Sequence, residues 1–205
     1  MSATSDVARG VRLPRQARRA QLLAAAREVF VAQGYHAAAM DDIAERAGVS
    51  KPVLYQHFPG KLDLYLALLD LGREQIVASV KAALESTHAN KTRVQAVVAA
   101  YFAFVHDEAG AFRLIFESDL TNDPQVRERV DATNTDCAEL ICGVIREDTG
   151  LSESESLLLA VGLTGLAQTA ARHWLREGEA IPQDAAAALV ARLSWRGISG
   201  VPPKG

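Results

Sequence analysis

The chain has 205 residues, 49% of them hydrophobic, and a formal net charge of −3 at pH 7. No apolar run approaches the roughly 18 residues that a membrane-spanning helix needs, and the N-terminus is polar and arginine-rich, unlike a secretion signal. The two cysteines, Cys137 and Cys142, are five residues apart, a spacing that fits no metal or redox motif. We therefore expect a cytoplasmic protein with reduced, buried thiols and no bound metal.

The first predicted helix has one apolar stripe and ends at Gly34, a residue that suits a left-handed helix end. Its stripe comprises Leu22, Ala26, Val29 and Phe30, followed at helical spacing by the polar Gln33. A second, shorter helix follows and closes at Gly48. Its stripe comprises Met40, Ile43, Ala44 and Ala47.

A third helix is predicted directly after this glycine turn. Ser50 is placed to cap its N-terminus, and Pro52 is tolerated in the first turn because the missing N–H has no intrahelical partner there. Leu54 and Phe58 are four residues apart and should face inward, and Pro59-Gly60 ends the helix. The other side chains should face outward or sideways: Lys51, Val53, Tyr55, Gln56 and His57. Two short helices around a sharp turn indicate a helix-turn-helix, whose second helix enters a DNA major groove.

The outward side chains have the chemistry that DNA recognition requires. Lys51 can donate to a guanine edge or a phosphate, Val53 can contact a thymine methyl, and Gln56 can pair with adenine. Donors suited to phosphate oxygens, which set the register on DNA, are Tyr55, His57 and Lys61. Taken singly, each residue fits a solvated helix face better. Their joint placement on one short helix after a glycine turn favours DNA binding.

Charge is distributed unevenly along the chain. Residues 1–61 hold nine Lys/Arg against five Asp/Glu, whereas the remainder holds 13 basic and 20 acidic groups. A basic head on an acidic body suits a local contact with DNA. Arg9, Arg12, Arg15 and Arg19 precede or open the first helix, and they predict either an arm along the DNA backbone or minor groove, or a disordered soluble tail.

The rest of the chain predicts one helix after another, without strand alternation or an internal repeat. The expected ranges are 64–84, 94–107, 112–117, 124–148, 153–177 and 182–196. Asp123 before Pro124 is an N-cap followed by a first-turn proline, and Ser152 with Glu155 forms a capping box. The predicted fold class is all-α.

The segment from Arg18 to Lys61 resembles the DNA-binding domain of the TetR family of bacterial regulators. The matching elements are Ala25-Ala26 through Phe30, Gly34-Tyr35, Met40 to Ile43-Ala44, Ala47-Gly48-Val49-Ser50, Leu54-Tyr55-Gln56-His57-Phe58 and Lys61. One departure is Ala38-Ala39, because the family usually has Thr or Ser before the second helix; His36 or backbone N–H groups are left to contact phosphate. Pro52-Val53 replaces a more common small pair, so the base preference should be this protein's own.

The resemblance implies four segments: a flexible arm (1–14), a three-helix DNA-binding domain (15–61), a helical bundle for ligand binding and dimerisation (62–198) and a tail (199–205). It also implies a set of DNA-contacting residues. They are Arg15, Met40, Ser50, Lys51, Pro52, Val53, Tyr55, Gln56, His57 and Lys61.

Phenylalanines gather around Gly110, where they either fill a core or line a cavity between helices. The resemblance favours a cavity, because the C-terminal bundles of the family usually hold a small effector. The expected rim and wall residues are Phe102, His106, Phe112, Arg113, Phe116, Cys137, Leu140, Ile141, Leu166 and Gln168. His106 and Arg113 are the expected polar contacts.

Small residues between Ser154 and Trp174 permit close helix approach, either within the chain or to a second copy. In TetR relatives the last two long helices pair with their copies as a four-helix interface. This implies a homodimer on a palindromic operator. The implied contacts are Leu163, Leu166, Ala167, Ala170, Trp174, Leu189 and Leu193.

We therefore expect a ligand-responsive transcription factor, a repressor released by a small apolar effector. The alternative is an activator of fatty acid synthesis genes that responds to long-chain acyl-CoA, because Trp195 to Gly200 resembles the ending of the actinobacterial fatty-acid-synthase regulators. No cofactor is expected. An enzyme is disfavoured because the five histidines form no catalytic constellation, and a helical adaptor would leave the basic head unexplained.

Overall fold

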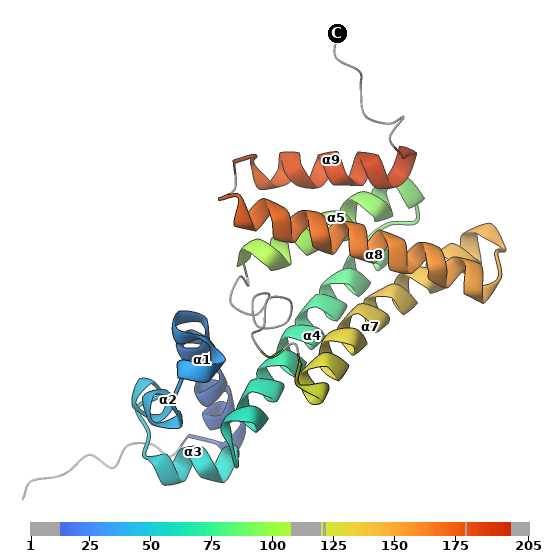
Figure 1. Ribbon diagram of the computed structural model, residues 1–205. Coiled ribbons are helices and arrows are strands. Elements are labelled where there is room, and N and C mark those ends of the chain that lie inside the picture. Colours follow the sequence, from blue (N-terminus) through green and yellow to red (C-terminus); the bar gives the residue numbers. More distant parts are fainter. Residues whose placement is uncertain (1–12, 108–119, 121, 179, 198–205) are drawn as a thin grey trace, which may run out of the picture.

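The computed structural model describes residues 13–107, 120, 122–178 and 180–197, and every regular element within them is a helix (Figure 1). The helices are α1 (Arg15–Ala37), α2 (Met40–Arg46), α3 (Lys51–His57), α4 (Lys61–Glu85), α5 (Asn90–Asp107), α7 (Pro124–Thr149), α8 (Glu153–Arg176) and α9 (Gln183–Arg196). The all-α prediction is confirmed. The helix expected at 112–117 lies outside the described residues.

Helix ends follow the predicted capping chemistry in the body. The Asp123 carboxylate accepts hydrogen bonds from the backbone N–H groups of Gln125 and Val126, and the capping box of Ser152 and Glu155 is complete. In the head, Ser50 occupies the N-cap of α3, but its side chain makes no capping hydrogen bond. Gly34 has φ 77°, and helix resumes after it as far as Ala37, so this glycine kinks α1 instead of ending it.

The three-helix head is attached to the body through the start of α4 (Figure 1). Tyr65 of α4 packs its ring against Phe30 and Tyr35 of α1, with ring centroids 5.3 and 5.1 Å apart. The ammonium of Lys61 donates to the backbone carbonyls of Tyr35 and Ala38, each at 2.8 Å, and lies 4.6 Å from the centre of the Tyr35 ring. These contacts fix the end of α1 to the first turns of α4.

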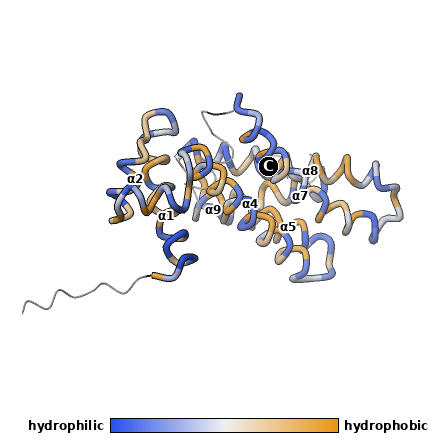
Figure 2. Tube along the Cα trace, turned by 90° about the horizontal axis from the view of Figure 1, so that it is seen from below, coloured by the Kyte–Doolittle hydropathy of each residue, from blue (hydrophilic) through white to orange (hydrophobic). Residues whose placement is uncertain are grey.

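The body is a bundle in which α7 packs against α4 and α8, and α5 packs against α4, α8 and α9. In Figure 1, α4 and α7 run side by side from the head end, while α8 and α9 lie across the far end. Hydrophobic and hydrophilic residues alternate along the helices in Figure 2, as expected for helices with one buried stripe. None of the described helices is long and apolar enough to cross a membrane.

Two ion pairs connect α4 to α7. The Arg73 guanidinium lies 2.6 Å from the Asp136 carboxylate, and Nε of Arg129 lies 3.1 Å from the Asp70 carboxylate. Each helix thus supplies one cation and one anion. All four side chains are partly exposed, so the pairs specify helix register more than they add stability.

Candidate functional site

Helix α3 presents the side chains that the sequence predicts on its outer surface. Leu54 and Phe58 are buried, which confirms their inward direction, while Tyr55 remains 48% exposed. Lys51, Pro52 and Gln56 are also exposed, and Val53 and His57 are half-buried. The outer face of α3 is therefore a short row of polar and aromatic groups held by two buried anchors.

Lys51 at the start of α3 is paired with α2. Its ammonium lies 2.6 Å from the Asp41 carboxylate. This hydrogen bond, and then the charge of the carboxylate, raises the pKa of Lys51, so the side chain stays protonated. The pair braces the two helices of the helix-turn-helix, and a phosphate approaching Lys51 would share it with Asp41.

A groove of about 540 Å³ separates the start of α1 from α3. It is lined by Leu13, Arg15, Arg18, Val53, Gln56 and His57. The groove therefore brings Arg15 to the surface that carries Gln56, as the family resemblance implies. Arg18 also lines the groove, but the expected DNA-contacting set did not include it. Its spacing of three residues from Arg15 on one helix would have placed both side chains on the same face.

Arg18 also begins a chain of contacts across the head. Its guanidinium donates to the side-chain carbonyl of Gln21 at 2.8 Å, and the Gln21 amide donates to the backbone carbonyl of Ala47 at the same distance. The neighbouring Arg19 places its guanidinium 4.4 Å from the centre of the Phe58 ring. Side chains of α1 thus hold the turn and the end of α3 in place.

Three other residues of the expected DNA-contacting set have different surroundings. Lys61 is not presented as a phosphate donor, because its ammonium is engaged by backbone carbonyls at the end of α1. Met40 is partly buried against the core, and Ser50 is exposed with an uncommitted hydroxyl. Ala39 occupies the N-cap of α2 without a side-chain bond.

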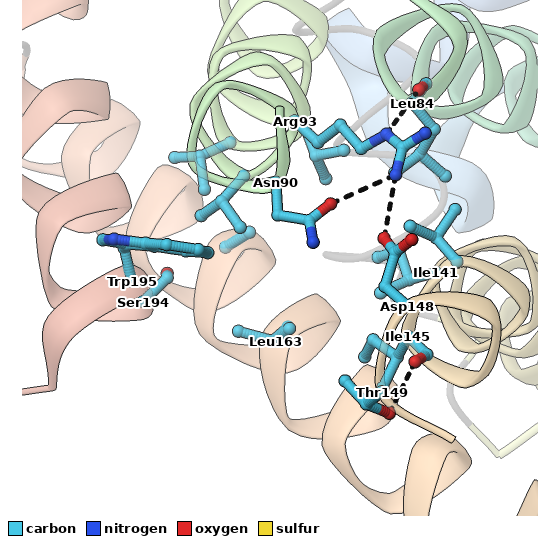
Figure 3. Close-up of a pocket in the computed structure, with 15 residues that line it drawn as sticks. Leu84, Asn90, Arg93, Ile141, Ile145, Asp148, Thr149, Leu163, Ser194 and Trp195 are labelled. Carbon is cyan, nitrogen blue, oxygen red and sulfur yellow. Dashed lines mark hydrogen bonds and ion pairs between the residues drawn. The ribbon is translucent and has the colours of Figure 1, made fainter. Parts of the chain in front are cut away.

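The body contains an apolar cavity of about 300 Å³ between five helices (Figure 3). Its lining comprises Leu84, Asn90, Arg93, Val94, Val97, Val98, Ile141, Val144, Ile145, Asp148, Thr149, Leu163, Ala167, Ser194 and Trp195. Aliphatic side chains dominate this lining, and the volume lies at the lower end of the usual range for ligand cavities. The cavity is suited to a hydrocarbon group.

One side of the cavity is closed by an ion pair and the opposite side by an indole (Figure 3). Arg93 lies 2.9 Å from the Asp148 carboxylate and also donates to the backbone carbonyl of Thr87 at 2.8 Å and to the side chain of Asn90 at 3.1 Å. Its guanidinium is therefore committed to structure. Trp195 of α9 stands across from this pair.

The cavity differs from the one expected around the phenylalanines. Of the predicted wall residues, Ile141 lines it, whereas the other described ones do not: Phe102, His106, Cys137, Leu140, Leu166 and Gln168. Phe102 and Cys137 are buried in the core, with the Phe102 ring 5.5 Å from that of Trp174. Phe112, Arg113 and Phe116 lie outside the described residues. The described aromatic residue of the predicted set, Phe102, belongs to the core, whereas the cavity is lined mainly by aliphatic side chains.

Burial in the core of the body keeps the Cys137 thiol and the Tyr101 phenol neutral. Tyr101 and Cys137 are both buried on facing helices. Burial, and then the neighbouring Cys137, raises the pKa of Tyr101 far above its usual range. Burial also raises the pKa of the Cys137 thiol. Both cysteines are free and buried, as the sequence analysis expected.

The outer face of α8 and α9 differs from the predicted contact set. Trp174 is buried in its own chain, and its indole N–H donates to the backbone carbonyl of Ile181 at 2.6 Å. Leu163 and Ala167 line the cavity instead of the surface. Leu166, Ala170 and Leu193 are half-buried, and Leu189 is exposed. The exposed residues of α8 include Leu158, which is 74% exposed, Val161, Gly162 and Gly165.

Comparison with known proteins agrees with this geometry. Residues 22–68 match the family described as bacterial regulatory proteins, tetR family. The chain is 46% identical over 194 residues to the HTH-type transcriptional activator FasR of Mycolicibacterium smegmatis, which covers 95% of this chain and 89% of that protein. It is 27% identical over 173 residues to the HTH-type transcriptional regulator UidR of Escherichia coli K12, covering 79% and 86% of the two chains.

Two solved structures share the whole architecture. A TetR-like transcriptional regulator from Rhodococcus sp. RHA1 superimposes with a TM-score of 0.74 at 28% identity, over 93% of this chain and 100% of that one. The transcriptional regulator FadR from Bacillus subtilis, in complex with stearoyl-CoA, gives a TM-score of 0.76 at 19% identity, over 87% and 98%. The second likeness concerns the fold alone.

Proposed function

The chain belongs to the TetR family of bacterial regulatory proteins and is a DNA-binding transcriptional regulator, not an enzyme, and we propose that it is a homodimeric activator controlled by a long-chain acyl-CoA. The sequence analysis favoured a repressor. The 46% identity to a protein named as a transcriptional activator supports activation instead, and this similarity is the observation that carries the proposal.

The cavity supports an acyl chain as the part of the effector that enters the body. Its lining is mainly aliphatic, and no charged group of it is left without a partner, because Arg93 and Asp148 neutralise each other. Burial of a methylene group is favourable by about 0.8 kcal/mol, so an alkyl chain gains affinity with each carbon that enters. The fold likeness to a FadR structure containing stearoyl-CoA is consistent with this class of ligand.

The outer face of α8 and α9 is the proposed contact with a second copy. Leu158, Val161 and Leu189 are exposed there, and Gly162 and Gly165 leave room for a close helix. We leave Trp174 and Ala167 out of the interface because both are buried within their own chain. A two-fold dimer places two copies of α3 on DNA, with half-sites about one helical turn, roughly 34–36 Å, apart.

Helix α4 is the proposed connection between cavity and DNA. Leu84 near its end lines the cavity, and Lys61 and Tyr65 at its start hold the head. An effector that binds one position of α4 better than another shifts the population toward that position by its differential affinity, commonly about 1–3 kcal/mol. Two ion pairs connect α4 to α7, so a movement of α4 along α7 must break or exchange them.

The test is a fluorescence-anisotropy titration on DNA from upstream of the protein's own gene, with scrambled DNA as control. Measurements at several salt concentrations, with and without palmitoyl-CoA, separate specific from electrostatic binding. We expect specific binding that weakens steeply with salt and changes with palmitoyl-CoA. Affinity that is unaltered across acyl chain lengths would overturn the proposed effector. A reporter assay of the bound promoter then gives the sign of regulation.

A further inference from the structure

We propose that the groove between α5 and α9 binds the phosphate-bearing head group of the effector whose tail fills the cavity. The inference rests on the acyl-CoA effector proposed above and adds a second subsite to it. The ligand class is an acyl chain joined to a phosphorylated head, as in an acyl thioester of coenzyme A.

The groove adjoins the cavity through one side chain. It has a volume of about 230 Å³, and Lys91 and Gln95 of α5 face Arg192, Trp195 and Arg196 of α9 across it. Trp195 also lines the apolar cavity, and it is 44% exposed. Trp195 therefore separates the cavity from the groove, and a hydrocarbon chain that passes this indole reaches the groove.

The groove is basic within an acidic body. Its lining includes three cations and no carboxylate, although residues 62–205 hold 13 basic and 20 acidic groups. Arg192 and Arg196 are one turn apart on α9, and Lys91 lies in the first turn of α5, where the exposed N–H groups of a helix favour an anion. Within the part of the chain that the structure describes, neither Lys91 nor Arg192 has an ion-pair partner.

Arg93 shows what a structural cation looks like at the same end of α5. It is two residues from Lys91, yet its guanidinium contacts Asp148 and the carbonyl groups of Thr87 and Leu84. Among the described residues, Lys91 and Arg192 have no such partners, and both face a shared groove. This contrast indicates that Lys91 and Arg192 serve a ligand and not the fold.

The position of the groove argues against DNA as the anion that its cations bind. Helix α9 lies at the opposite end of the molecule from α3 (Figure 1). The lining of the groove comes from α5 and α9 alone, and it includes none of Leu158, Val161 and Leu189, the exposed residues that we assign to the dimer contact. A phosphorylated small molecule entering from solvent fits this position. The phosphates of coenzyme A can bind the cations, and Gln95 can bond to a polar arm.

The test is isothermal titration calorimetry of the full chain with palmitoyl-CoA and with palmitate. The groove variant is Lys91→Ala/Arg192→Ala, and the control variant Lys81→Ala/Arg176→Ala removes the same charge from exposed positions outside the groove. We expect the groove variant to lose about tenfold in affinity for palmitoyl-CoA, corresponding to about 1.4 kcal/mol, with palmitate binding unchanged. The salt dependence of palmitoyl-CoA binding should also become shallower in this variant.

The outcomes separate the two proposals. If palmitoyl-CoA binds the wild type and the groove variant equally, the groove assignment is overturned and the acyl effector stands. The same holds if the groove and control variants lose equal affinity. If the wild type binds neither ligand, the acyl effector itself is overturned, and the groove assignment with it.

Discussion

In the head, most of the side chains assigned to DNA lie on one helix of seven residues, α3, whose core-facing residue is Leu54. In the body, the residues around the cavity come from five helices and point toward one another. A surface of the first kind depends on spacing along the chain. A cavity of the second kind depends on how distant helices pack, and small changes in packing open or close it.

This difference predicts which substitutions affect DNA binding and which affect ligand binding. Single outward substitutions in the head should change binding without changing the fold. In the body, a change of side-chain volume should affect the ligand and leave the DNA surface alone. The junction at Lys61 belongs to both regions, so breaking it should have the largest effect.

Lys61→Met removes the ammonium that binds the last carbonyls of α1 while keeping an apolar stem. We expect the free energy of unfolding to fall by about 1.5–3 kcal/mol, since hydrogen bonds from a charged group are lost at a partly buried site. Chemical denaturation measures this change in the free energy of unfolding. Lys81→Met is the control, because the pair that Lys81 makes within the described part of the chain is a surface pair with Glu85. Equal losses in both variants would mean that Lys61 does not fasten the head.

Substitutions on α3 should weaken DNA binding and leave stability intact. Gln56→Ala should reduce operator affinity by about tenfold and leave scrambled DNA little affected, because an amide that reads a base is lost. Tyr55→Ala should weaken binding to both DNAs, since phosphate contacts carry no sequence information. Anisotropy titration measures both effects.

Gln33→Ala is the matched control, because Gln33 is also exposed but lies on α1, away from α3. Unchanged operator affinity of the Tyr55 and Gln56 variants, with the dimer intact, would contradict the assignment of α3 to DNA.

Leu163→Phe should partly fill the cavity. We expect affinity for palmitoyl-CoA to fall by about tenfold, with ligand-free operator affinity unchanged. Calorimetry and anisotropy measure the two quantities. Leu166→Phe, three residues further along α8 and outside the cavity lining, is the control. A larger loss in the Leu166 variant would place the ligand where the sequence analysis expected it.

The smallest expected effect concerns pH and the capping box of α8. Hydrogen bonds from the Ser152 hydroxyl and backbone N–H lower the pKa of Glu155. A carboxyl group with a lowered pKa stabilises the fold above its unfolded pKa, about 4.3, and loses this contribution as pH falls through the folded value. The melting temperatures of wild type and Ser152→Ala should therefore converge as pH is lowered. Ser154→Ala, at the second residue of α8 and outside the capping box, should show no such convergence.

Local chemistry allowed much of the fold to be predicted from the sequence. Asp123 and Ser152 cap the helices they were expected to cap, and Leu54 and Phe58 face inward. These features depend on neighbours within four residues. The prediction for Ser50 was right in position but not in hydrogen bonding, because a cap residue can leave its hydroxyl to solvent.

The cavity and the groove could not be predicted from the sequence, because they do not depend on neighbours close in sequence. Phe102 was predicted to line the cavity because it is an aromatic residue near a helix break, yet it is packed against Trp174 in the core. The small residues of α8 were interpreted as one surface, but Ala167 faces the cavity and Gly165 faces outward. Helical position alone does not say which side meets another helix of the same chain. That choice is made by contacts between residues far apart in sequence.

Trp195 has a practical consequence. The chain has two tryptophans, and the other one, Trp174, is buried with its indole N–H bonded to a carbonyl, so its emission should change little on binding. Trp195 is partly in solvent and borders both the cavity and the basic groove. The protein thus carries its own optical probe at the point where tail and head of the effector would meet. A blue shift in fluorescence would report occupancy without any label.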